Sequence, residues 1–189
     1  MAMRRPEPGF WTYEDLLAMP EDGRRYEIVE GVLWEMTGPS SPHAVSVRNL
    51  IALLLPIFAA RRMEWFTAPL DVFFAGANPV QPDLLACVRG GATVRSQRGI
   101  EGAPDFVVEV LSPSTRGHDG LTKRALYGWA VVREYWLVDP DARTVEILAL
   151  DGEVLRHAWS GSGEDVMRSG LLPDAAFSVA AVFAEPDLG

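Results

Sequence analysis

The sequence is poor in cysteine and in long apolar runs. Its 189 residues include a single cysteine, Cys87, which excludes an internal disulfide and favours a reducing compartment, so we expect a cytoplasmic protein. The opening stretch MAMRRPEPGFW lacks the apolar segment of a signal peptide. The longest apolar run, residues 50–60, contains Pro56 and is shorter than the roughly 20 residues of a membrane-spanning helix. We therefore expect no membrane partner.

Lysine is as scarce as cysteine. Of the 17 basic residues, only Lys123 is a lysine and the rest are arginine. Arginine carries a planar guanidinium, whereas lysine carries a compact ammonium on a flexible stem. A lysine in such a chain suits a position that needs a compact charge. An accident of composition is the alternative explanation for a single residue.

Acidic residues outnumber basic residues, which gives a net charge of −9 and a pI of about 4.8. Nucleic-acid-binding domains usually have a basic face, so this balance counts against tight nonspecific binding of DNA. It does not exclude such binding, because metal-binding carboxylates contribute to the same negative charge. The hydrophobic content of 48% is ample for one core and argues against disorder, and the length predicts one domain over residues 1–189.

Apolar periodicity and turn residues predict mixed α and β structure. Thr12, followed three residues later by Asp15, predicts a capped N-terminal helix, and RYEIVEGVLWEM predicts a β-hairpin of residues 25–30 and 32–37. A helix capped by Ser41 is expected over residues 43–60, with Leu55 among its core side chains. Further strands are expected over residues 64–67, 71–74, 105–111, 134–139, 144–150 and 153–159, helices over 121–131 and 179–183, and a loop over 89–103.

Two acids stand inside apolar strands. Asp83 belongs to VQPDLLACV and Glu109 to FVVEVL, and a buried carboxylate is costly unless it is paired or bound to metal. Each acid alone could also face solvent or pair with an arginine. The order is more specific, because an acid on one strand and an acid on the next are followed by Lys123 at the opening of a helix. Carboxylate oxygens suit Mg²⁺, and an ammonium nearby can hold an attacking water or offset phosphate charge.

Three other polar residues belong to these expected elements. Glu27 lies on the first hairpin strand, where a solvent-facing position is the simplest interpretation. His43 lies in the first turn of the long helix, where we expect a surface histidine rather than a catalytic base. Tyr127 follows Lys123 by four residues, so the two share a helical face.

Six stretches together resemble a known family. They are RYEIVEGVLWEM, SPHAVSVRNL, VQPDLL, GAPDFVVEVLSPST, KRALY and VREYWLVDPDARTVEIL, and they cover roughly residues 10–160. In this order the chain resembles the Uma2 family, also called DUF820, of the restriction-endonuclease-like PD-(D/E)xK superfamily. The resemblance implies an α/β (α+β) fold in which a mixed β-sheet is flanked by helices, with an N-terminal helix and a β-hairpin.

The resemblance also implies site residues. Asp83 matches the first acid of the superfamily motif and Glu109 the second. The usual lysine two residues later is absent, because Leu111 stands there, and Lys123 on the following helix matches a relocated lysine. A lysine on a helix has to reach back across the site.

The remaining implied roles concern the metal and the substrate. Glu27 matches an N-terminal glutamate of the family, and Tyr127 a tyrosine one turn beyond the lysine. The resemblance implies that Asp83, Glu109 and the Val110 carbonyl bind one Mg²⁺ or Mn²⁺, with Glu27 binding directly or through water. It implies an endonuclease acting on nucleic acid, with DNA as the expected substrate, and leaves a homodimer open.

Two other functions remain as alternatives. One is a catalytically silent nuclease fold that binds a nucleic acid or protein partner, which the acidic pI favours. The other is a hydrolase that uses Glu27 and Glu109 as an acid and base pair on another substrate, which gives no account of Lys123. Divalent-metal affinity separates the first alternative from a nuclease.

Overall fold

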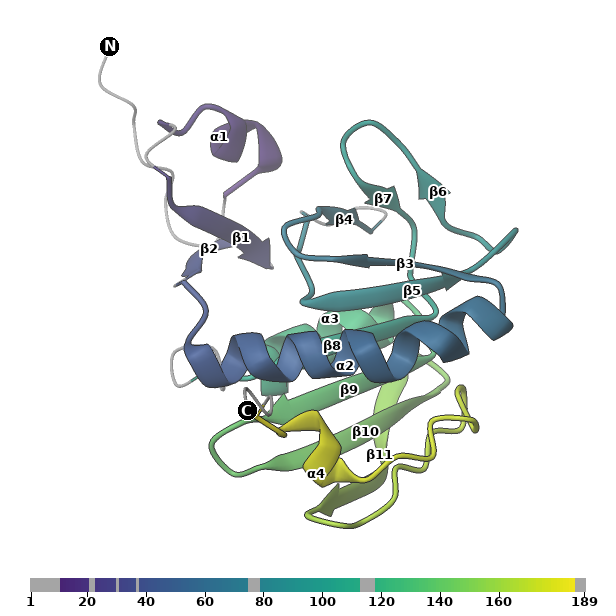
Figure 1. Ribbon diagram of the computed structural model, residues 1–189. Coiled ribbons are helices and arrows are strands. Elements are labelled where there is room, and N and C mark those ends of the chain that lie inside the picture. The colour runs from purple at the N-terminus through teal and green to yellow at the C-terminus, as the bar shows by residue number, and fades with distance from the viewer. Residues whose placement is uncertain are drawn as a thin grey trace.

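The structure is a computed structural model (Figure 1) that describes residues 11–20, 23–29, 31–36, 38–74, 79–112 and 118–185. Its centre is a six-stranded sheet, in which β8 and β9 run parallel and the other neighbouring pairs antiparallel. The expected mixed sheet is therefore confirmed. In spatial order the strands are β11 (Val154–Ser162), β10 (Thr144–Asp151), β9 (Glu134–Asp139), β8 (Phe106–Val110), β5 (Leu84–Val88) and β3 (Met63–Thr67).

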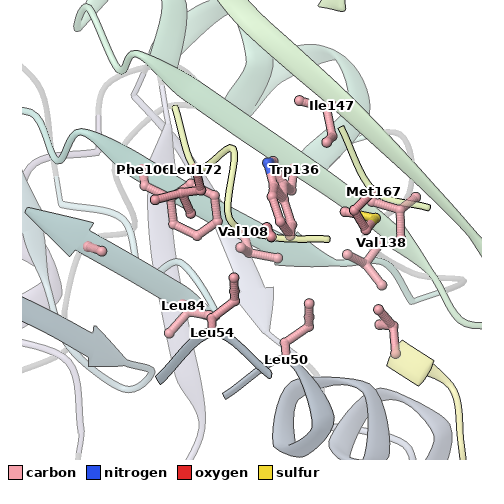
Figure 2. Close-up of a cluster of buried hydrophobic side chains, with 14 of the residues drawn as sticks. Leu50, Leu54, Leu84, Phe106, Val108, Trp136, Val138, Ile147, Met167 and Leu172 are labelled. Atoms are coloured by element: carbon pink, nitrogen blue, oxygen red, sulfur yellow. The ribbon is translucent and has the colours of Figure 1, made fainter. Parts of the chain in front are cut away.

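One face of the sheet is covered by α2 (Ser41–Ala60) and α4 (Val179–Val182) (Figure 1). Leu50, Leu54 and Phe58 lie at helical spacing and are fully buried against strand residues that alternate toward this face. Figure 2 shows this core, in which Leu50 and Leu54 lie near Leu84 and Val108. The prediction for Leu55 is wrong, because it is 43% exposed on the outer side of α2.

The length and apolar composition of α2 bear on the expectation that the chain has no membrane-spanning helix. With its 20 residues, α2 is long and apolar enough to cross a membrane by length and composition alone. Only 22% of its most apolar 18-residue stretch is buried. What the structure shows of its role is one buried stripe, which includes Leu50, Leu54 and Phe58 and packs on the sheet. The expectation considered only the apolar run of residues 50–60, whereas the helix that contains this run is longer.

The opposite face of the sheet carries the smaller elements. The expected hairpin is confirmed as β1 (Arg25–Val29) and β2 (Val32–Met36). A π-helical segment, His118–Lys123, leads directly into α3 (Arg124–Trp129), and Leu126 and Tyr127 of α3 pack on this face. The helix therefore begins before the expected residue 121 and ends before the expected residue 131, where the backbone of Val131 turns to a φ of +60°.

A small three-stranded sheet completes this side, with β4 (Val72–Phe73), β7 (Ile100–Glu101) and β6 (Val94–Arg95) in spatial order. The prediction of a loop over residues 89–103 is corrected here, because two of these strands fall within it. Each is only two residues long, with Thr93 and Ser96 on either side of β6 and Gly99 and Gly102 on either side of β7, so neither produces an alternating pattern. At Gly99 a side chain would collide with the carbonyl of Asp71, which explains a glycine at this close approach.

At the N-terminus, α1 (Tyr13–Leu17) has the expected capping box, since Thr12 and Asp15 bond to each other's backbone N–H groups.

Candidate active site

Four of the five predicted catalytic side chains form one buried cluster on the α3 face of the sheet. Glu109 lies in the middle of β8, between Val108 and Val110, which point into the α2 core. Strand alternation therefore directs Glu109 to the other face. Glu27 reaches the same place from β1, Lys123 from the end of the π-helical segment and Tyr127 from α3. Glu27, Lys123 and Tyr127 are 0% exposed and Glu109 is 3% exposed.

Lys123 joins the two glutamates of this cluster. Its Nζ lies 2.9 Å from Glu27 Oε2 and 3.0 Å from Glu109 Oε1. The four-residue spacing places Tyr127 on the same side of the helix, and its hydroxyl donates to Glu109 Oε1 at 2.6 Å. An ammonium between two carboxylates compensates charges that would be strongly destabilising if they were buried alone.

Burial also controls the protonation of Tyr127. The loss of hydration, followed by the negative charge of Glu109, raises the pKa of Tyr127 well above its usual value. The phenol therefore remains protonated at neutral pH and can donate to Glu109. Its ring packs edge-on against Phe74 and Tyr135, which fixes the position of the hydroxyl.

Glu27 has a second set of partners that the sequence did not indicate. The backbone N–H of Gln81 donates to Glu27 Oε1 at 2.6 Å, and the Gln81 side chain donates to Asp71 Oδ1 at 2.9 Å. Burial raises the pKa of Asp71, the bond from Gln81 lowers it and the nearby charge of Glu27 raises it again. Asp71 thus adds a third acid near the cluster, and its only signal in the sequence is an acid directly before the apolar pair Val72 and Phe73.

Asp83, the fifth predicted residue, lies at the edge of this arrangement. It precedes β5, and the β5–β8 register, extended by one pair, places it opposite Glu109. Its Oδ2 accepts from the Val110 N–H at 2.7 Å, and its Oδ1 lies 3.2 Å from His43 Nε2. Asp83 is therefore attached to the strand of Glu109, while the contacts to Lys123 described above belong to the two glutamates.

His43 is the main correction among the site residues. It was expected on the surface, yet its side chain is only 14% exposed and contacts Asp83. The reason is the start of α2: the N-cap is Ser40 rather than Ser41, and its Oγ accepts from the backbone N–H of His43. The first turn of α2 thus faces the beginning of β5.

Comparisons with known proteins show the family and the fold of this chain. The model of one family, Uma2, described as "Putative restriction endonuclease", matches residues 13–180. This chain belongs to the Uma2 family. Among solved structures, a protein from Anabaena variabilis ATCC 29413, described as "a putative nuclease belonging to DUF820", is similar with a TM-score of 0.74 and 19% identity, covering 92% of this chain and 97% of that one. At this identity the similarity shows the fold alone. Curated proteins give no match.

In this Uma2 chain, Asp83 and His43 open onto a hollow of about 390 Å³. The N-terminal half of α2 forms one wall, and the chain after β3 forms another. The hollow has polar groups at Asp83, His43, Thr67 and Arg48 above an apolar floor that includes Val47 and Ile51. The volume of the hollow is within the range of small-ligand sites, and a molecule from solvent can reach Asp83 through it.

Metal binding at the Uma2 site depends on how its acids are arranged. Within the described ranges, no group of three or more His, Cys, Asp or Glu side chains is arranged to hold a metal ion. The donor chemistry nevertheless fits, because Asp83, Glu109 and Glu27 offer the oxygens that a hard cation prefers. Leaving aside Asp71, these three acids and Lys123 sum to two formal negative charges, which a divalent ion would neutralise. Because the described side chains do not form a three-ligand group as they stand, the binding of one ion by all three acids requires side chains to move.

Proposed function

We propose that this chain is a divalent-metal-dependent endonuclease that hydrolyses phosphodiester bonds, with DNA as its substrate. The observation that carries the proposal is the buried cluster of Glu27, Lys123, Glu109 and Tyr127 beside Asp83, in a chain of the Uma2 family. A lysine that is the only one in the chain, fully buried between two acids, is difficult to explain as a surface charge. Buried clusters of oppositely charged side chains, here with a tyrosine whose pKa is raised by burial, are typical of functional sites.

In this proposal Asp83, Glu109 and the Val110 carbonyl hold Mg²⁺ or Mn²⁺, with Glu27 as a further ligand. Such an ion lowers the pKa of a bound water and polarises a phosphodiester oxygen. The β5–β8 pairing holds Asp83 and Glu109 on neighbouring strands, so the two carboxylates approach from a rigid support. The bond from Val110 N–H fixes one Asp83 oxygen, which limits the directions in which the other can act.

Lys123 has the second role. When it releases a glutamate, its ammonium remains within reach of the same space, where it can orient the attacking water or offset the charge that develops on phosphate. Tyr127 keeps its bond to Glu109 during this change, because the phenol stays protonated and its ring is held by aromatic neighbours. This bond keeps the Glu109 carboxylate in place when the Lys123 side chain moves.

The test is a cleavage assay on single-stranded DNA, duplex DNA and RNA with Mg²⁺, with Mn²⁺ and with chelator. We expect cleavage of DNA by the parent protein with either metal, and a loss of about 10²-fold or more in Glu109→Gln and Asp83→Asn. Glu64→Gln is a matched control, because Glu64 is a strand acid paired with exposed Arg95 away from the cluster. Equal cleavage by parent, Glu109→Gln and control would identify a contaminating nuclease and refute the proposal.

A second candidate, a catalytically silent binding module, is favoured by two observations. Lys123 pairs with both glutamates in the structure, and no three-ligand metal group is found among the described residues. Calorimetry with Mn²⁺ separates the two candidates. Binding that disappears in Asp83→Ala and Glu109→Ala supports the nuclease, whereas no binding by the parent supports the silent module.

A further inference from the structure

His43 is held in a fixed position at the start of α2. The Ser40 hydroxyl accepts from its backbone N–H, and Pro42 stands in the first turn, where its ring suits the helix. Ser46, which is fully buried, donates to the Pro42 carbonyl at 2.9 Å. The backbone that carries the His43 ring is therefore restrained on both sides, and the ring is directed toward the beginning of β5.

Asp83 is restrained equally well from its own side. Its carbonyl accepts from the Ala68 N–H at 3.3 Å, and its Oδ2 accepts from the Val110 N–H at 2.7 Å. The remaining oxygen, Oδ1, lies 3.2 Å from His43 Nε2. The side chains of His43 and Asp83 are 14% and 18% exposed, so water has limited access to this contact.

We infer that His43 is a positioning residue, which donates its Nε2–H to Asp83 and holds that carboxylate in the orientation in which it acts. The inference rests on the proposed function, because it assigns Asp83 a role in cleavage. A bond to Val110 alone leaves the carboxylate free to rotate about that contact, and the bond from His43 removes this freedom. Each oxygen still has a second lone pair, so both bonds are compatible with an additional ligand.

The same geometry argues against His43 as the base that activates water. A base needs a ring nitrogen that is open to the hollow, whereas Nε2 faces Asp83 and Nδ1 is buried. Residues that orient a ligating carboxylate typically contribute 10–100-fold to metal affinity or activity, and this sets the scale of the expected effect.

The experiment compares four variants of the full chain. His43→Ala removes the donor. His43→Gln places an amide N–H near the position of Nε2, whereas His43→Asn is too short and places its amide near Nδ1. His157→Ala is the matched control, because His157 is an exposed histidine on β11 that contacts Ser160. The readouts are the Kd of Mn²⁺ by calorimetry, the rate of DNA cleavage and the melting temperature.

We expect His43→Ala and His43→Asn to weaken Mn²⁺ binding about 10–100-fold and to slow cleavage by a similar factor, while His43→Gln recovers most of both. His157→Ala should match the parent. Equal effects of Gln and Asn, or losses that follow the melting temperature alone, would reduce His43 to a packing residue and overturn the inference. Parent-like binding and cleavage in His43→Ala would overturn it as well, while leaving the proposed nuclease intact.

A second readout needs no metal. In the metal-free protein, nitrogen NMR of the imidazole should show a proton on His43 Nε2, and Asp83→Asn should shift this signal while Glu64→Gln does not. A bare Nε2 would contradict the inference directly. If the parent neither binds Mn²⁺ nor cleaves any substrate, the proposed function fails first, and the positioning role fails with it.

Discussion

Replacing Lys123 with methionine removes the charge at the centre of the buried cluster and nearly preserves its length. The ammonium lies 2.9 Å from Glu27 and 3.0 Å from Glu109, and the lysine is 0% exposed. In Lys123→Met both carboxylates remain buried, with the Gln81 N–H and the Tyr127 hydroxyl still donating but with the ammonium gone.

The size of the effect follows from this geometry. Removing one partner of a buried ion pair typically costs about 3–5 kcal/mol, because the other charge is left uncompensated. The methionine side chain refills the space, so a cavity adds little. For a chain of this length each kcal/mol lowers the melting temperature by roughly 2–4 °C, so the variant should melt roughly 6–20 °C below the parent.

The assay is urea denaturation at pH 7, followed by circular dichroism in parent, Lys123→Met, Glu27→Gln and the double variant. The double variant should lose less free energy of unfolding than the two single losses added together, by about 1–3 kcal/mol, because the charges compensate each other. Lys123→Met within about 0.5 kcal/mol of the parent, or strict additivity, would show that Lys123 and Glu27 do not interact as the structure describes.

Four further predictions concern residues of the site and the core. Lys123→Arg should retain fold and Mn²⁺ binding but slow cleavage about 10²-fold or more, because a planar fork misplaces the water; an unchanged rate would refute the relocated-lysine mechanism. The raised pKa of Tyr127 contributes stability that is complete below pH about 10 and is lost at higher pH, so urea denaturation should show the advantage of the parent over Tyr127→Phe falling by about 1.4 kcal/mol per pH unit above that point. Burial raises the pKa of Cys87, so the native thiol should react slowly with a disulfide reagent at pH 8, and Cys87→Ser should lower stability while leaving cleavage largely intact. Glu134→Gln should cost about 2–4 kcal/mol in urea denaturation without changing Mn²⁺ affinity, since Glu134 accepts four bonds far from the cluster.

Local signals in the sequence were sufficient for much of the fold. The Thr12 cap, the strand Glu134–Asp139 and the strands predicted over residues 144–150 and 153–159 depend on neighbouring residues, and all are found close to the expected bounds. The exposed Leu55 was not predictable in the same way, because helical spacing gives the width of an apolar stripe only approximately. The two-residue strands β6 and β7 lie below the length at which alternation can be recognised.

The candidate site was predictable for residues that have both an apolar neighbourhood in the sequence and a characteristic order along the chain. Glu109 and Lys123 were identified by an apolar context and by rarity, yet Glu134 stands in an equally apolar strand and has a different role. It accepts bonds from Trp136, Ser169 and two backbone N–H groups, and holds the C-terminal segment to the sheet. Only tertiary contacts distinguish an acid satisfied by neutral donors from one that shares an ammonium, and they also explain why His43 and Asp71 were missed.

The position of Leu111 explains how a lysine can move from a strand to a helix without leaving the site. Strand alternation places Leu111 on the same face as Glu109, and its side chain packs in the apolar cluster beneath α3. A lysine at that position and a lysine at 123 would therefore approach Glu109 from the same side of the sheet. The helix has one advantage: Lys123 and Tyr127 are four residues apart, so a single element carries both donors to Glu109 Oε1. Leu111 is then free to contribute to the core, and the charge of Lys123, which is catalytic in the proposed function, becomes part of the packing between α3 and the sheet.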